Sequence, residues 1–322
     1  MNHTIIITEN HVNERLDQAL AKLLPEYSRS QLKDWIDAGH VLVNKLPVKA
    51  KYKVKLDDTI SVAPQIKSLP SSWVAEAIDL NIIYEDSELL IINKPVGLVV
   101  HPGAGNANAT LLNALLHHAP ELNELPRAGI LHRLDKNTSG LLVVAKTPAA
   151  LKSLTHQLKQ RSMSREYFAI VCGDLISGGE VDAPIGRHPL KRKTMAVSAE
   201  GKPARTHYRI AEKFRAHTLL SLKLDTGRTH QIRVHMQYIR HPIVGDPVYG
   251  GRIQLPKHAT PELTQGLRQF PRQALHAFAL GFEHPKTHEA MRWVIDLPED
   301  MQQLLATLRD DTKEFNHGHH QR

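Results

Sequence analysis

The densest group of polar side chains in the sequence lies at residues 129–140, between two apolar stretches. This segment holds one carboxylate, Asp135, together with the side chains of His132, Arg133 and Thr138. A loop anchored by strands at both ends can hold a single carboxylate in place, where it can act as a nucleophile or a general base. An ordinary hairpin, in which Asp135 caps backbone amides, is the alternative that the pattern leaves open.

A second polar segment, residues 224–235, carries two arginines that can meet an anion. The planar guanidinium groups of Arg228 and Arg233 suit either a carboxylate or a phosphate. The spacing of the apolar residues fits both a strand and a helix that begins near Thr229. A pair of ordinary surface arginines is the alternative for this segment.

A tyrosine opens one of the apolar stretches. Tyr167 follows Arg165 and Glu166 directly, so a strand here would place its ring on a face of a sheet. An aromatic ring in that position can stack on a nucleobase. A tyrosine buried in the core is the alternative, because its ring also fills apolar space.

Positive charge is concentrated in one part of the chain. Lys and Arg number 41 against 33 Asp and Glu, which gives a formal net charge of +8. Residues 151–252 alone carry 18 basic and 8 acidic side chains, a net charge of +10. A uniformly solubilising surface would spread this charge, so the concentration favours a basic face that binds a polyanion such as a nucleic acid.

Several classes of protein are disfavoured by what the sequence lacks. It has no run of about 18 apolar residues and no basic and apolar leader at its start, so we expect a soluble, cytoplasmic protein with no membrane partner. Its one cysteine, Cys172, can form no internal disulfide. No phosphate-binding loop, dinucleotide fingerprint or metal-ligand spacing occurs, so no cofactor and no metal are expected.

The first part of the chain reads as a small unit of two helices followed by strands. Leucines at helical spacing predict a helix over 16–24. Ser28 followed three residues later by Gln31 is a capping-box signature that opens a second helix. Short strands are predicted at 41–44 and around 59–62.

The composition also indicates where the domains divide. Residues 63–75 contain two prolines and a pair of serines, which predicts a linker between a small domain at 1–62 and a larger one at 76–322. The lysine-rich stretch 45–55 in the small domain is either a phosphate-binding edge or an ordinary solvated edge strand.

The larger domain contains short apolar stretches separated by turn residues. Strands are predicted at 89–92, 141–144 and 168–171, and helices at 111–118 and 149–160. Regular alternation of long strands and helices is not apparent. The predicted fold class is therefore α+β, with a largely antiparallel sheet.

Taken together, these motifs resemble those of the ribosomal large-subunit family of pseudouridine synthases. The segment from His132 to Asp135, followed by Thr138, Ser139 and Gly140, is similar to the catalytic loop of that family. Three other segments match its remaining signatures in the same order: 92–103, 165–167 and 227–235. Residues 15–17 and 28–30 resemble the alpha-L RNA-binding motif that many members carry.

The resemblance implies roles for individual residues. Asp135 matches the aspartate that attacks the anomeric carbon or removes a ribose proton, and Arg233 matches its guanidinium partner. Tyr167 matches the tyrosine that stacks on the target base, and Arg133 the arginine that fills the gap left by the flipped nucleotide. Further substrate-binding residues implied are His132, Thr138, Arg228, His230 and Gln231. Those implied in the RNA-binding module are Arg15, Ser28, Arg29 and Lys33.

The resemblance also implies a substrate: uridines of 23S rRNA, free or in an assembling large ribosomal subunit. We expect a monomer, since nothing in the sequence demands a dimer. A glycoside hydrolase is a rival, but it normally needs two carboxylates and Asp225 has no evident partner role. A non-catalytic rRNA-binding assembly factor is the other rival, in which Asp135 and Arg233 form only a structural ion pair.

Overall fold

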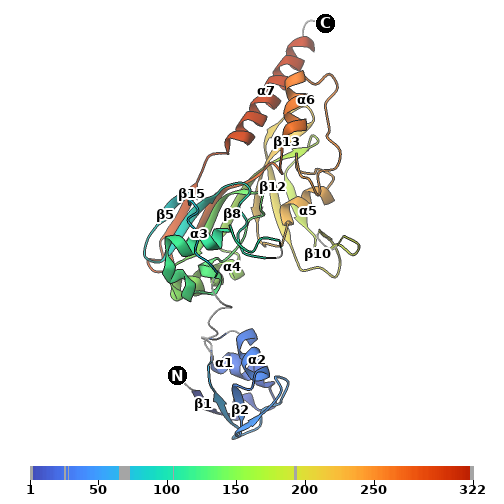
Figure 1. Ribbon diagram of the computed structural model, residues 1–322. Coiled ribbons are helices and arrows are strands. Elements are labelled where there is room, and N and C mark those ends of the chain that lie inside the picture. Colours follow the sequence, from blue (N-terminus) through green and yellow to red (C-terminus); the bar gives the residue numbers. More distant parts are fainter. Residues whose placement is uncertain are drawn as a thin grey trace. The chain divides into compact units, whose positions relative to one another are not determined.

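The computed structural model describes residues 3–24, 27, 29–64, 73–103, 105–191 and 194–319. The chain divides into two compact units, Met1–Ser72 and Trp73–Arg322 (Figure 1). Most of the predicted linker, residues 65–72, lies outside the described residues. No helix in the described ranges is long and apolar enough to cross a bilayer.

The first unit packs two helices on a four-stranded sheet. The predicted helices and strands are confirmed, whereas the capping box at Ser28 lies outside the described residues. Leu16, Leu20 and Leu32 are fully buried between the helices and the sheet. The sheet has the order β1-β4-β2-β3. The elements are β1 (His3–Ile6), η1 (Glu9–His11), α1 (Leu16–Leu23), α2 (Arg29–Asp37), β2 (Val41–Val43), β3 (Leu46–Pro47) and β4 (Thr59–Val62).

The second unit is built on a nine-stranded sheet, with the order β5-β6-β7-β14-β8-β13-β12-β9 and β15 paired to β14. Among the described strands, β14 pairs with β7 in parallel and the other pairs are antiparallel, which confirms the predicted α+β class. These strands are β5 (Ile82–Glu85), β6 (Leu89–Lys94), β7 (Ser139–Ala145), β8 (Ser164–Cys172), β9 (Gly179–Asp182), β12 (Arg205–Lys213), β13 (His217–Leu224), β14 (Leu275–Glu283) and β15 (Ala290–Val294).

Helices and a small hairpin surround this sheet (Figure 1). The hairpin consists of β10 (Ile185–Arg187) and β11 (Met195–Val197). The helices are α3 (Leu111–His118), η2 (Pro120–Glu124), η3 (Pro126–Gly129), α4 (Pro148–Gln160), α5 (Gln231–Tyr238), α6 (Pro261–Gln269) and α7 (Glu299–His319).

Residues 89–92 of β6 and 141–145 of β7 are continuous apolar stretches because both faces of the sheet are covered there. Leu90 and Leu142 belong to a core cluster that includes residues of α3, while Leu89 and Leu141 belong to a second cluster that includes residues of α4. Side chains alternate between the two faces of a strand, so neighbouring leucines enter different clusters. The predicted catalytic loop therefore leads into a strand that is packed from both sides.

Gly140 allows the end of this loop to approach β14 closely. Its φ is +117°, and a Cβ atom placed there would lie 2.2 Å from the carbonyl oxygen of Ala277. A residue with a side chain would clash with the backbone of the neighbouring strand and would have to adopt a strained φ. The parallel pairing of β7 with β14 at Ala277 thus requires glycine at this position.

Candidate active site

The predicted site residues of the second unit converge on one cavity of about 480 Å³. Asp135, Tyr167 and Arg233, the three predicted catalytic residues, all line it. They come from the loop before β7, from β8 and from α5. The predicted substrate-binding residues also line it: His132, Arg133, Thr138, Arg228, His230 and Gln231. Tertiary structure thus brings together segments that are up to about a hundred residues apart.

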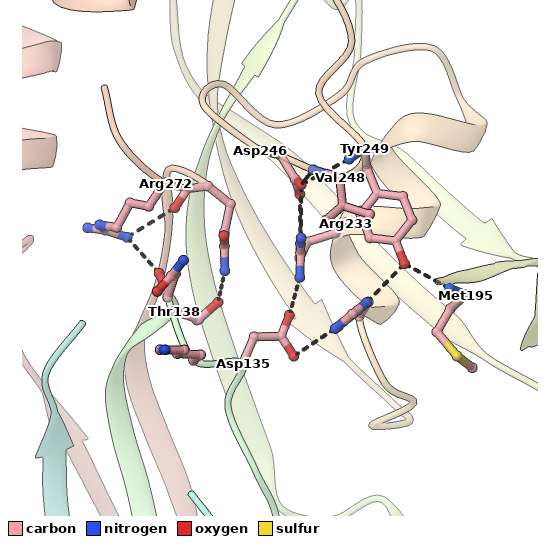
Figure 2. Close-up of polar contacts among 12 residues, drawn as sticks. Asp135, Thr138, Met195, Arg233, Asp246, Val248, Tyr249 and Arg272 are labelled. Carbon is pink, nitrogen blue, oxygen red and sulfur yellow. Dashed lines mark hydrogen bonds and ion pairs between the residues drawn. The ribbon is translucent and has the colours of Figure 1, made fainter. Parts of the chain in front are cut away.

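An ion-pair network orients the candidate catalytic carboxylate (Figure 2). Nη1 of Arg233 donates to Oδ2 of Asp135 at 3.0 Å, while Nε and Nη2 of Arg233 donate to the two oxygens of Asp246 at 2.7 and 2.9 Å. The Asp246 side chain is fully buried, and Asp135 retains 16% exposure toward the cavity. Asp246 therefore holds the guanidinium from behind, and the guanidinium presents its remaining edge to Asp135.

This arrangement keeps Arg233 charged. Burial by itself disfavours the charged form, but the hydrogen bonds and charge attraction to Asp246, with a smaller contribution from Asp135, raise the pKa of Arg233 above its ordinary value. The helix that carries Arg233 begins at Gln231, directly after His230 in the left-handed region with φ 57°. The helical interpretation of residues 229–235 is thus confirmed.

A second contact approaches Asp135 from His230. Its Nε2 lies 3.8 Å from Oδ1 of Asp135, and its Nδ1 lies 2.9 Å from the hydroxyl oxygen of Tyr249. That oxygen also accepts a hydrogen bond from the backbone N–H of Met195 at 2.9 Å, on the hairpin strand β11 (Figure 2). Burial lowers the pKa of His230, although Asp135 opposes this shift.

We infer the tautomer of His230 from these contacts. A lone pair on Nε2 would repel the carboxylate of Asp135, so Nε2 carries the proton and Nδ1 accepts from the hydroxyl of Tyr249. Tyr249 consequently fixes the N–H group that faces the candidate catalytic oxygen.

We predict that Tyr249→Phe lowers the rate of the chemical step about fivefold, since one orienting hydrogen bond contributes roughly 1 kcal/mol. Single-turnover kinetics would measure the rate, and filter binding would show an unchanged affinity for the RNA substrate that the resemblance implies. The double variant with His230→Asn should be no slower than His230→Asn alone, because the two residues act as a unit. Additive losses would contradict the tautomer assignment.

Tyr167 presents a neutral phenol to the cavity. It lies on β8, paired with Leu222 on one side and Ala277 on the other, and only 6% of its surface is exposed. Burial raises the pKa of Tyr167, so the hydroxyl stays protonated at neutral pH. A rigid ring beside Asp135 is suited to stacking on a planar base.

Three residues to which the sequence analysis gave no role hold the candidate catalytic loop. Lys94, which is fully buried at the end of β6, donates from Nζ to the carbonyl oxygens of Pro95, Leu98 and Lys136 at 2.7 to 3.1 Å. Burial lowers the pKa of Lys94 to about 7, and the charge of Asp135 opposes that shift.

The other two are Arg272 and Gln273, which precede β14. Arg272 donates to the carbonyl oxygen of Asn137 at 3.3 Å and forms a two-bond ion pair with Asp300 at the start of α7. Gln273 donates to the hydroxyl of Thr138 at 3.1 Å (Figure 2). The loop is therefore tied to both β6 and the segment before β14.

Several predicted substrate-binding residues make contacts that position the site. Thr138 is only 2% exposed, and its hydroxyl accepts the bond from Gln273. His132 accepts a hydrogen bond from the N–H of Val143 at 3.3 Å, and burial lowers its pKa to about 3, so the imidazole is neutral. Gln231 donates to the carbonyl oxygen of Arg205 and accepts from the N–H of Arg228.

The mouth of the cavity is cationic. Arg133 is exposed there, and Arg228 donates from Nε to the carbonyl oxygen of Pro203 at 3.0 Å. Three exposed basic side chains also line the cavity: Arg127, Lys159 and Arg161. Exposed cations at the entrance suit the phosphates of a nucleic acid.

Asp225 also lines the cavity, but it has a different partner. Its carboxylate lies 3.1 Å from Nε2 of His207. The contact forms because β12 and β13 are adjacent strands, which brings His207 beside Asp225. That Asp225 has no role as a second catalytic carboxylate stays a prediction.

The predicted RNA-binding residues of the first unit lie near one another where they are described. Arg15 and Arg29 both donate to Asp17, a buried carboxylate, while about half of each guanidinium side chain stays exposed. Lys33 lines a shallow groove together with Arg15 and lysines of the 45–55 stretch. Ser28 lies outside the described residues.

Comparison with known proteins agrees with this site. Residues 88–238 match the family described as RNA pseudouridylate synthase, and residues 14–60 match the S4 domain. The chain is 53% identical to "Ribosomal large subunit pseudouridine synthase D" of Yersinia pestis, over 96% of this chain and 95% of that protein. It is 52% identical to the protein of the same name from Escherichia coli strain K12, over 97% of this chain and 95% of that protein.

Solved structures give the same result. Human RNA Pseudouridylate Synthase Domain Containing 4 is 27% identical with a TM-score of 0.56, and covers 71% of this chain and 93% of its own. Human RNA Pseudouridylate Synthase Domain Containing 1 is 26% identical with a TM-score of 0.52, over 73% and 96%. The chain belongs to the family of RNA pseudouridylate synthases. Its relatives carry the name of the D-type large-subunit enzymes, the branch that the combination of motifs also favours.

Proposed function

We propose that this protein isomerises uridines of 23S rRNA in the large ribosomal subunit to pseudouridine. The observation that carries this proposal is the carboxylate of Asp135, oriented by Arg233 beside the ring of Tyr167, in a cavity with a cationic mouth. The near full-length similarity to large-subunit enzymes supports the choice of RNA.

The reaction breaks the bond between N1 of uracil and C1′ of ribose, rotates the base and joins C5 to C1′. The proton on C5 is lost and N1 gains one, so substrate and product contain the same atoms. Asp135 either attacks C1′ or removes a ribose proton, and both roles need its ionised form. Tyr167 keeps the detached base in place.

The target uridine must leave its stack to reach this cavity, which costs a few kcal/mol. We propose that Arg133, exposed at the mouth, occupies the gap that the nucleotide leaves. The other rim cations and the basic surface of residues 151–252 bind phosphates, so affinity for RNA is expected to fall steeply with salt.

The main experiment compares pseudouridine maps of 23S rRNA from cells with and without this protein. We expect one or a few sites to remain uridine in its absence, and to be restored by the wild-type protein but not by Asp135→Asn. Restoration by the variant would favour a non-catalytic assembly factor, since such a protein needs no ionised carboxylate.

We further propose that residues 1–62 form an RNA-binding domain, joined through 63–75 to the catalytic domain at 76–322. The match to the S4 domain and the exposed cations Arg15, Arg29 and Lys33 support this. Removing residues 1–62 should weaken binding to rRNA at least tenfold while the catalytic domain keeps its cooperative thermal transition. Loss of that transition would contradict the boundary.

We also propose that the protein acts as a monomer in the cytoplasm, where its rRNA substrate is made. Asp135, Tyr167 and Arg233 converge on one cavity within a single chain, so the proposed chemistry calls for no residue of a second copy. Light scattering at the protein concentration used for assays would measure the mass, and a dimer that is required for activity would contradict the proposal.

A further inference from the structure

Arg165 is a buried guanidinium with almost no hydrogen-bond partners. Only 7% of its surface is exposed. Its Nε has no partner among the described residues, and its Nη2 reaches the carbonyl oxygen of Leu224 only at 3.5 Å. No ion pair of Arg165 occurs in the part of the chain that the structure describes. The nearby carboxylate Asp225 is in contact with His207 instead.

The other two deeply buried arginines of this region are fully paired. Arg233 forms two bonds to Asp246 and one to Asp135, and Arg272 forms two bonds to Asp300. A buried charge is expensive unless hydrogen bonds and an opposite charge compensate for it. Because such compensation is lacking for Arg165, the pKa of its guanidinium is lowered by burial. A hydrogen-bond acceptor on a bound ligand would compensate for the buried charge of Arg165.

Arg165 faces the place where such a ligand would lie. It lines the same cavity as Asp135 and Tyr167. It precedes Tyr167 by two positions on β8, so both side chains are on one face of the strand, with Cα atoms about 7 Å apart. Gly227 leaves room for it, since a Cβ atom there would lie 2.8 Å from Nη1 of Arg165.

Depth distinguishes Arg165 from the cations of the rim. Lys159 and Arg161 line the cavity but are exposed, which suits phosphates that stay in contact with water. When a flipped nucleotide enters a pocket, its base goes deepest and its phosphates stay at the mouth. The buried guanidinium is therefore placed for the base.

We propose that Arg165 donates hydrogen bonds to a carbonyl oxygen of the target pyrimidine, and that it stabilises the negative charge of the detached base. This inference builds on the proposed function. When the bond from N1 to C1′ breaks, its electron pair stays on the base and is delocalised onto O2 and O4. A guanidinium beside one of these oxygens interacts more strongly with the detached anion than with the neutral uridine, and so accelerates bond cleavage.

The first test uses single-turnover release of tritium from C5 of uridine in an rRNA fragment. Arg165→Gln should lower the maximal rate about a hundredfold, the usual effect of losing one donor to a developing anion. Its dissociation constant for RNA and the salt dependence of that constant should stay as in the wild type. The matched variant Arg161→Gln should instead weaken binding and reduce the salt slope by about one. If Arg165→Gln instead shows the weaker binding and smaller salt slope expected for Arg161→Gln, the proposal is overturned in favour of a phosphate contact.

The second test identifies the contact at the base. The target uridine is replaced by 2-thiouridine or 4-thiouridine, whose sulfur is a weaker hydrogen-bond acceptor. One of the two replacements should slow the wild type by at least fivefold more than it slows Arg165→Gln, because that variant has already lost the contact. Equal slowing of both proteins by each replacement would show that Arg165 does not touch the base.

Two controls separate failure of this inference from other failures. If Arg165→Gln does not give the wild-type circular dichroism spectrum, Arg165→Lys replaces it in both tests, because a lysine keeps the charge but cannot reproduce the planar fork. If the wild type releases no tritium, the proposed function itself is wrong. An active wild type together with an equally active Arg165→Gln would overturn only the role of Arg165.

Discussion

Asp135→Asn is expected to reduce the release of tritium from C5 of uridine by at least about a thousandfold. The amide has nearly the same shape as the carboxylate, but it can neither attack C1′ nor accept a ribose proton. The fold should survive, because Arg233 keeps its two bonds to Asp246 and the Asp135 side chain already retains 16% exposure. Rates would be measured under single turnover with saturating protein.

The matched control is Asp225→Asn. Asp225 also lines the cavity, but its carboxylate is in contact with His207 rather than with Arg233. The Asp225→Asn variant should keep most of the wild-type activity. If instead Asp225→Asn and Asp135→Asn lose activity equally, a mechanism with two carboxylates, as in glycoside hydrolases, would replace the one proposed. Unchanged release by Asp135→Asn would refute its catalytic role.

The second large effect is expected for Arg233→Gln, which should lose both activity and stability. Removing the guanidinium leaves the fully buried carboxylate of Asp246 without its charged partner. Breaking a buried ion pair on one side costs about 3 kcal/mol or more in the free energy of unfolding. Asp135 loses its orienting donor at the same time, so we expect the rate to fall at least about a hundredfold. Urea denaturation and tritium release would measure the two losses.

A double variant separates these two consequences. In Arg233→Gln combined with Asp246→Asn, no unpaired charge remains buried behind the site, so at least half of the lost stability should return. Activity should not return, because Asp135 still lacks the guanidinium. If activity recovers along with stability, Arg233 acts only as a structural element and does not orient the carboxylate.

Local sequence patterns predict most of the secondary structure because they depend on near neighbours. Leucine spacing predicts a helix over 16–24, and the structure has α1 at Leu16–Leu23. The apolar stretch 89–92 is indeed a strand, although β6 extends two residues further to Lys94. The apolar pattern does not predict this extension, because a lysine is rarely buried in a strand. Lys94 can be buried here because its ammonium group donates to three carbonyl oxygens.

The segment at 229–235 shows where local patterns stop being decisive. Ile232 and Val234 fit a strand as well as a helix. Both are buried in the structure, in the helix α5. The choice follows from the turn at His230, whose φ of 57° ends the extended backbone, and from Gln231, which bonds back to the preceding loop. These are contacts across the turn, which no alternation of apolar residues can reveal.

By itself, the sequence determined the fold class, the chemistry available and the residues that match a known family. Only the tertiary structure decided how Asp135 is held. Asp246 lies 13 positions beyond Arg233, and Tyr249 lies 19 positions beyond His230, so no helical or strand period connects them. It also left Nε of Arg165 buried with no hydrogen-bond partner among the described residues. The physical reason is that burial and ion pairing depend on which distant segments of the chain pack together. Local residue spacing and composition do not specify that packing.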